Sequence, residues 1–256
     1  MQEPITIQSS QNAHYKSLIR LFQKSRERKK TNSFVVEGSR EIQRAITRDF
    51  EVVQLWIREG TPISQTIEGS CFELKKELFD KIAQRGGNET EIAVFKARHW
   101  PLDQLVLPAK AKLLVAEAPE KPGNIGALLR TAAGAGMDAV FIANPKTDLY
   151  NPQSIRNSLG GIFSLPIIMD SSENIIAYLK KHSFFIAAAA LSEKSIPYTD
   201  CTYPPPMAIA VGTEANGLQA QWLEAADVCV QIPMQSPIDS LNVSVAAGIL
   251  IYQALT

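Results

Sequence analysis

Along residues 103–256, short apolar runs alternate with segments whose apolar residues recur at helical spacing. The runs are expected to be buried strands, at residues 112–118, 139–143, 165–169, 184–191, 207–211 and 228–233. The segments between them are expected to be helices, at residues 124–136, 154–158, 173–181, 219–225 and 239–255. Apolar strands that alternate with helices are typical of a parallel sheet covered on both faces. This part of the chain is therefore predicted to be one α/β domain.

Residues 1–102 have a different rhythm and predict a second, smaller α/β domain. A helix is expected over residues 10–30, because Leu18, Leu21 and Phe22 share one face and basic residues cover the other. The further elements expected are strands at residues 34–36, 52–57 and 91–98, a helix at 40–46 capped by Ser39, a helix at 74–83 and a turn at 85–88. Pro101 and Pro108 mark the boundary between the two domains.

Small and polar residues gather in three turns, each of which follows a predicted strand. The turns are residues 122–132, 211–218 and 232–244. Because ligands of open parallel sheets bind beyond the carboxyl ends of the strands, these turns predict a single site. The second and third turns are expected at neighbouring strand ends, where they would form one polar crevice.

Arg130 is the only charged residue between Lys121 and Asp138, on a helix of small and aliphatic residues. A guanidinium in such surroundings needs a partner. It pairs with a carboxylate, for which Glu214 is the candidate, or it contacts a phosphate or another part of a substrate. Asn124 stands at the start of the same helix and is its expected cap.

The other two turns combine glycines with polar side chains. Gly212 and Gly217 suit a strand-to-helix turn that needs positive φ. Asp239 or Ser240 is expected to cap the last helix. Asn242 is expected inside that helix, where asparagine is a poor helix former, so a role in a site is favoured there.

Composition and charge add a second candidate surface. Of the 256 residues, 45% are hydrophobic, which is enough apolar material for real cores. The formal net charge is zero, but residues 1–102 carry 17 Lys and Arg against 13 Asp and Glu. Most of this excess lies between Lys16 and Lys30. Such a cluster attracts phosphates or forms the solvated face of a helix.

Several classes of chemistry have no motif in this sequence. There is no dinucleotide fingerprint, no Walker motif and no Ser-His-Asp set, and His14, His99 and His182 lie outside the three turns. The cysteines have neither C-x-x-C spacing nor a histidine close by, so no metal site and no disulfide framework are expected, and a reducing cytoplasm fits. Without a signal peptide or a long apolar run, no membrane association is expected.

The three turns together resemble the motifs of the SpoU/TrmH family of RNA 2′-O-ribose methyltransferases, within the SPOUT superfamily. The resemblance rests on residues 124–132 (NIGALLRTA), 212–218 (GTEANGL), 232–234 (IPM) and 240–246 (SLNVSVA), which follow one another in the family's order. Residues 34–38 (FVVEG) and the basic helix before them also resemble the ribosomal-protein-like substrate-binding domain that often precedes this catalytic domain.

This resemblance implies a SPOUT-type parallel sheet with a deep trefoil knot, S-adenosylmethionine as the cofactor, and a homodimer with the site at the subunit interface. The positions that match the family's cofactor pocket are Val211, Gly212, Gly217, Ile232, Met234 and Leu241. The positions that match its catalytic and motif residues are Asn124, Arg130, Glu214, Ser240 and Asn242.

The implied activity is methyl transfer to a ribose 2′-hydroxyl of structured RNA, with rRNA favoured over tRNA because the first domain resembles a ribosomal protein. Arg130 is expected to clamp an RNA phosphate and stabilise the developing alkoxide, since a guanidinium stays protonated in proteins. The residues expected to bind RNA in the first domain are Lys24, Arg26, Arg28, Lys29 and Lys30. Two alternatives remain: a non-catalytic RNA-binding protein that kept the fold, and an oxidoreductase with a nicotinamide cofactor.

Overall fold

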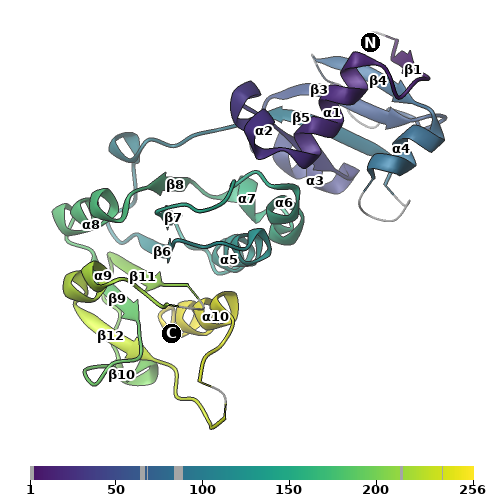
Figure 1. Ribbon diagram of the computed structural model, residues 1–256. Coiled ribbons are helices and arrows are strands. Elements are labelled where there is room, and N and C mark those ends of the chain that lie inside the picture. Colours follow the sequence, from purple (N-terminus) through teal and green to yellow (C-terminus); the bar gives the residue numbers. More distant parts are fainter. Residues whose placement is uncertain (1–2, 64–66, 68, 84–88, 214–215, 238) are drawn as a thin grey trace. The chain divides into compact units, whose positions relative to one another are not determined.

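The computed structural model describes residues 3–63, 67, 69–83, 89–213, 216–237 and 239–256 (Figure 1). The chain forms two compact units. The N-terminal unit comprises Met1–Arg98 and Leu149–Phe163, and the C-terminal unit comprises His99–Asp148 and Ser164–Thr256. Each unit has its own sheet.

The N-terminal unit is built on a mixed five-stranded sheet in the order β1-β4-β3-β5-β2. Its strands are β1 (Ile5–Ile7), β2 (Ser33–Glu37), β3 (Val52–Arg58), β4 (Ser70–Leu74) and β5 (Glu91–Lys96). Strand β5 pairs antiparallel with β2 and β3, whereas β4 pairs parallel with β3 and β1. The helices are α1 (Ala13–Gln23), α2 (Ser25–Thr31), α3 (Ser39–Ile46) and α4 (Lys76–Ile82). The predicted small α/β domain is confirmed.

The predicted helix over residues 10–30 is wrong in one respect, because it breaks at Lys24. The backbone of Lys24 is extended, with φ −122° and ψ 110°, and separates α1 from α2. Arg28 is buried, and its Nη1 donates to the carbonyl oxygens of Leu21 at 2.6 Å and Phe22 at 3.1 Å. The side chain thereby satisfies carbonyls at the end of α1 that a continuous helix would have bonded itself.

Three further details of this unit differ from the sequence-based prediction. The N-cap of α3 is Gly38, with φ 99°, and Ser39 is the first helical residue. The helix predicted at residues 74–83 begins only at Lys76, because Leu74 ends β4, which was not predicted. Strand β1, only three residues long, was also not predicted. The turn predicted at residues 85–88 lies outside the described residues.

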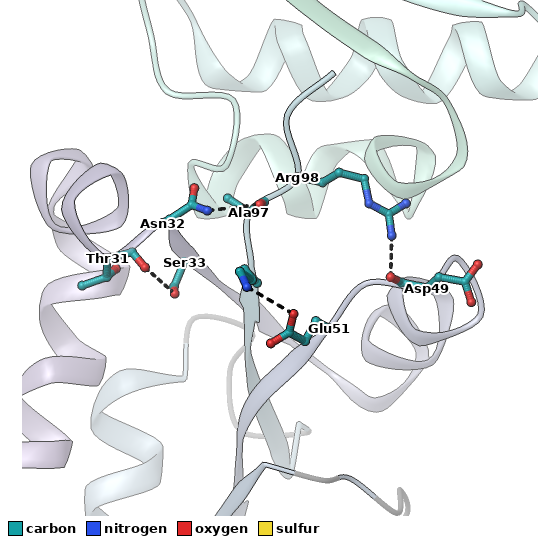
Figure 2. Close-up of polar contacts among 8 residues, drawn as sticks. Thr31, Asn32, Ser33, Asp49, Glu51, Ala97 and Arg98 are labelled. Carbon is teal, nitrogen blue, oxygen red and sulfur yellow. Dashed lines mark hydrogen bonds and ion pairs between the residues drawn. The ribbon is translucent and has the colours of Figure 1, made fainter. Parts of the chain in front are cut away.

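The segment Leu149–Phe163 packs into the N-terminal unit, although it connects two strands of the other sheet. The Tyr150 ring stacks on Phe34 at 4.2 Å between centroids, and its hydroxyl donates to the Arg98 carbonyl at 2.8 Å. Phe163 packs edge-on against Phe50 at 5.2 Å. The Arg98 guanidinium lies over the Phe50 ring, with its Cζ 4.4 Å from the ring centroid. It also donates a hydrogen bond to the Asp49 carbonyl (Figure 2). The segment contains α6 (Pro152–Ser158) and all but the last residue of α7 (Gly161–Ser164).

The C-terminal unit is built on a seven-stranded sheet in the order β10-β12-β9-β11-β6-β7-β8, and every pair is parallel. The strands are β6 (Lys112–Glu117), β7 (Ala139–Ala143), β8 (Ile167–Asp170), β9 (Phe185–Ala189), β10 (Ile196–Pro197), β11 (Met207–Val211) and β12 (Val228–Gln231). The predicted parallel sheet is thus confirmed. The short strand β10 was not predicted.

Helices cover both faces of this sheet (Figure 1). They are α5 (Pro122–Gly134), α8 (Ser172–Lys181), α9 (Ala220–Ala225) and α10 (Val243–Gln253). One face packs Phe141, Ile186 and Ala210 against Ile175 of α8 and Trp222 of α9. Helices α5 and α10 lie side by side at the opposite face. Single-turn 3-10 helices occur at Leu102–Gln104 and Tyr198–Asp200.

Two predicted helix starts in this unit are wrong. Helix α5 begins at Pro122 with Lys121 as its N-cap, so Asn124 lies inside the first turn and is not the cap. Helix α10 begins at Val243 and its N-cap is Asn242, so the cap is neither Asp239 nor Ser240. Among the described residues, no helix is both long enough and apolar enough to cross a membrane.

Candidate active site

A cavity of about 480 Å³ opens in the C-terminal unit at the carboxyl ends of β9, β11 and β12. All six residues predicted to bind the cofactor line it: Val211, Gly212, Gly217, Ile232, Met234 and Leu241. Ser240 also lines it. Residues from two separate turns therefore share one cavity, although β9 lies between β11 and β12 and the two strand ends are not neighbours as predicted.

The glycine-rich loop after β11 closes on itself beside the cavity. Thr213 and Gly217 exchange backbone hydrogen bonds of 3.1 and 2.9 Å, and Gly217 has φ +63°. A Cβ on Gly212 would lie 2.0 Å from the backbone carbon of Gly217, so only glycine allows this close approach. Glu214 lies outside the described residues, as does its predicted pairing with Arg130.

The N-termini of α5 and α10 are joined by a pair of asparagines. Asn242 Oδ1 accepts from the Ser244 backbone amide at 3.0 Å, which caps α10. Its Nδ2 donates to Asn124 Oδ1 at 3.1 Å, across 118 residues of sequence. The structure therefore brings together two of the predicted catalytic residues from different turns. Ser240 Oγ lies 3.5 Å from Asp239 Oδ1 in the loop that leads to this cap.

Arg130 lies six residues along α5 from Asn124, and it is exposed. Within the part of the chain that the structure describes, its guanidinium has no hydrogen-bond or ion-pair partner, and it is not among the residues that line the cavity. An exposed, planar cation on the helix that starts beside the site is suited to hold an anionic group of a substrate.

The predicted basic surface belongs to the N-terminal unit. Lys24, Arg26, Lys29 and Lys30 are exposed on and next to α2. The prediction for Arg28 is wrong, because this residue is buried and bonded to the end of α1. The end of α2 is fixed to the sheet through Asn32, whose Nδ2 donates to the Ala97 carbonyl at 3.5 Å (Figure 2).

Residues 111–252 match the SpoU rRNA Methylase family, and residues 12–93 match the MRM3-like substrate binding domain. The chain belongs to the SpoU rRNA methylase family. The predicted family is thereby confirmed, together with a substrate-binding domain in front of the catalytic one.

Similar proteins extend over nearly the whole chain. The 23S rRNA (guanosine(2553)-2′-O)-methyltransferase RlmP of Bacillus subtilis (strain 168) is 30% identical over 96% of this chain and 97% of its own. A crystal structure of an RNA 2′-O ribose methyltransferase shares 37% identity, with a TM-score of 0.85 and 98% of each chain covered. An AdoMet-bound rRNA methyltransferase from Sinorhizobium meliloti, 24% identical, has the same fold, with a TM-score of 0.89 over 97% of this chain and 96% of that one.

The sequence did not predict one wall of the cavity in this SpoU-family chain. Ala189, Ala190 and Leu191 line it from the end of β9. The apolar run at residues 184–191 was expected to be a strand, but sequence order does not show which strands are neighbours.

Burial raises the pKa of the Cys71 and Cys201 thiols, which disfavours the thiolate that nucleophilic catalysis by cysteine needs.

Proposed function

We propose that this chain transfers a methyl group from S-adenosylmethionine to a ribose 2′-hydroxyl of ribosomal RNA, with the cofactor in the cavity at the carboxyl ends of β9, β11 and β12. The observation that carries the proposal is that six residues predicted from family motifs, in separate turns, line one cavity. Membership of the SpoU family and the activity named for the Bacillus subtilis relative support it. The free thiols are consistent with a cytoplasmic enzyme.

The residues of the cavity fit this cofactor. A volume of about 480 Å³ lies within the range of roughly 300–1,000 Å³ that is usual for small-molecule sites. Leu191, Leu223 and Ile232 provide apolar wall for a flat base, and Thr213 and Asn216 provide polar groups beside it. When bound, the cofactor supplies a methyl group that is already electrophilic on a sulfonium, so the protein has to align and deprotonate the hydroxyl.

Arg130 is assigned to the RNA in this proposal. Its guanidinium would hold a phosphate beside the reacting ribose and stabilise negative charge on the 2′-oxygen as the proton leaves. A protonated guanidinium cannot accept that proton, so it leaves through the RNA phosphate, through water, or through the Ser240 hydroxyl, which passes its own proton on as it takes one. The hydrogen bond between Asn124 and Asn242 would hold the N-terminal ends of α5 and α10 in a fixed position relative to each other, beside the reacting groups.

The exposed basic residues of the N-terminal unit are assigned to RNA binding. Lys24, Arg26, Lys29 and Lys30 would contact phosphates, which position RNA without reading its sequence. The match of residues 12–93 to a substrate binding domain supports this role.

A homodimer forms through α10 in this proposal. The helix contains no charged residue, yet Val245 is 50% exposed and Tyr252 is 56% exposed, and a spacing of seven residues puts them on one face. A helix that is apolar on all sides is normally buried, so this face is the expected contact for a second copy. Light scattering should give twice the chain mass of 28.1 kDa.

The test is transfer of labelled methyl from S-adenosylmethionine to ribosomal RNA from a strain that lacks this gene. Wild-type protein should leave an alkali-resistant dinucleotide, which is the signature of a 2′-O-methyl group, and tRNA should be labelled less. Arg130→Lys keeps the charge but loses the two-pronged geometry, so it should lose most activity while its cofactor affinity stays near the wild-type value. Methylation of a base instead of a ribose, or wild-type rates in Arg130→Lys, would contradict this assignment.

A further inference from the structure

A buried carboxylate lies next to the cavity but outside its lining. Glu117 is the last residue of β6 and is only 1% exposed. Its Oε2 accepts the backbone N–H of Gln219 at 2.8 Å, and its Oε1 accepts the hydroxyl of Ser172 at 3.1 Å. None of the roles assigned to the site so far uses this side chain.

The hydrogen bonds around Ser172 require an acceptor at position 117. Ser172 Oγ accepts from Trp222 Nε1 at 2.9 Å and from Asn144 Nδ2 at 2.9 Å. These two bonds occupy both lone pairs of the hydroxyl, so its own proton must be donated, and Glu117 receives it. The carboxylate therefore joins the starts of α8 and α9 to the end of β6.

The bond to Gln219 connects this network to the cavity. Gln219 is the N-cap of α9, and its own side chain makes no capping bond to that helix. It directly follows Gly217 and Leu218, which line the cavity. The first residue after the cavity-lining Gly217 and Leu218 is therefore held in place by the hydrogen bond from its backbone amide to the Glu117 carboxylate.

Two energetically unfavourable features coincide at this point of the chain. A carboxylate is costly to bury unless its hydrogen bonds are made. The next residue, Ala118, has φ +45°, a left-handed conformation that is unfavourable for a residue with a Cβ. Strained backbone persists where surrounding structure holds it, and it is concentrated at functional sites.

We propose that Glu117 is a positioning residue of the cofactor site: it fixes the Gly217–Leu218 wall through the Gln219 amide and so sets the affinity for S-adenosylmethionine without touching it. The inference rests on the proposed function, because it assigns this cavity to that cofactor.

Three full-length variants separate positioning from stability. Glu117→Ala removes the acceptor of Gln219 and should weaken S-adenosylmethionine binding about tenfold or more, because it leaves a donor at the cavity wall without its partner. Glu117→Gln keeps a carbonyl oxygen for Gln219 but turns a donor toward Ser172. Ser172→Ala removes the hydroxyl and leaves the Glu117–Gln219 bond in place. Both of these variants should melt at lower temperature but bind the cofactor within about threefold of wild type.

The measurements are calorimetric titration well below each melting temperature and hydrogen exchange at the Gln219 amide, which should accelerate only in Glu117→Ala. Cofactor affinity in Glu117→Ala within threefold of wild type would overturn the inference. It would also be overturned if affinity fell in all three variants in step with melting temperature. If wild-type protein failed to bind S-adenosylmethionine, the proposed function itself would be overturned, and this inference with it.

Discussion

Asn242 caps α10 and also bonds to Asn124, so one side chain ties together two helix starts beside the site. The sequence marked this asparagine as unusual but placed it inside the helix, where its cost would have needed a functional explanation. At the N-cap, asparagine is a favoured residue. Capping of α10 thus accounts for an asparagine at position 242, and only its bond to Asn124 indicates a role besides capping.

At the residue scale, Gly212→Ala is expected to open the glycine-rich loop. The added Cβ would meet backbone atoms of Gly217 and Leu218 at 2.0 to 2.3 Å, and these cannot move without breaking the Thr213–Gly217 bonds. Calorimetry should show S-adenosylmethionine affinity falling by at least about tenfold, which corresponds to about 1.4 kcal/mol.

The matched control is Gly134→Ala at the end of α5, where a Cβ would have nothing within 4 Å. Alanine is the better helix former by about 0.5–1 kcal/mol, so this variant should bind the cofactor normally and melt at the wild-type temperature or slightly higher. Equal loss of affinity in both glycine variants would mean that the close approach at Gly212 is not what shapes the cavity.

At the element scale, the break between α1 and α2 depends on Arg28. Arg28→Ala removes the donor that satisfies the carbonyls of Leu21 and Phe22 and should lower the free energy of unfolding by about 1–3 kcal/mol. Arg26→Ala, two residues earlier on the exposed face, should change it by no more than about 0.5 kcal/mol. Urea denaturation followed by circular dichroism compares the two, and equal effects would contradict the buried role of Arg28.

The exposed face of α2 gives the complementary prediction. A triple variant in which Arg26, Lys29 and Lys30 become alanine removes three phosphate contacts, so the slope of log K against log salt should fall by about two to three units. Fluorescence anisotropy with a labelled rRNA fragment measures this slope. An unchanged slope would mean that these residues form only a solvated helix face.

Helices and strands were predicted well where the apolar pattern is strong, and poorly where a tertiary contact determines where an element begins or ends. The apolar strands at residues 139–143 and 207–211 coincide with β7 and β11, because uninterrupted apolar runs identify buried parallel strands. The break at Lys24 could not be predicted, since it depends on where the Arg28 side chain goes after folding. Strand β1 is too short to carry a periodic signal and forms by pairing with β4, in which the partner of Ile5 is Phe72, 67 residues further along the chain.

At the scale of the whole molecule, the chain passes between its two units three times, after Arg98, Asp148 and Phe163. Sequence reasoning expected residues 154–158 to belong to the second domain, as a helix between two strands of one sheet. Whether such a helix covers its own sheet depends on aromatic contacts, here those of Tyr150 and Phe163 with Phe34, that no local pattern reveals. The trefoil knot implied by the family stays a prediction.

A fragment of residues 1–102 should therefore be less stable than the same residues in the full chain. It lacks Tyr150 and Phe163, and loss of a large buried aromatic side chain typically costs about 3–5 kcal/mol. Hydrogen exchange should show faster exchange in Ser33–Glu37 of the fragment than in the full-length protein. Equal protection in both would mean that Leu149–Phe163 contributes nothing to the stability of the N-terminal unit.

The central claim is that the cavity at the carboxyl edge of the parallel sheet holds S-adenosylmethionine. Calorimetric titration of the full-length protein tests it most directly, with NAD titrated separately as the competing cofactor class. The account predicts micromolar binding of S-adenosylmethionine at one site per chain, and loss of that binding in Gly212→Ala. Binding of NAD alone, or S-adenosylmethionine binding that Gly212→Ala leaves intact, would contradict it.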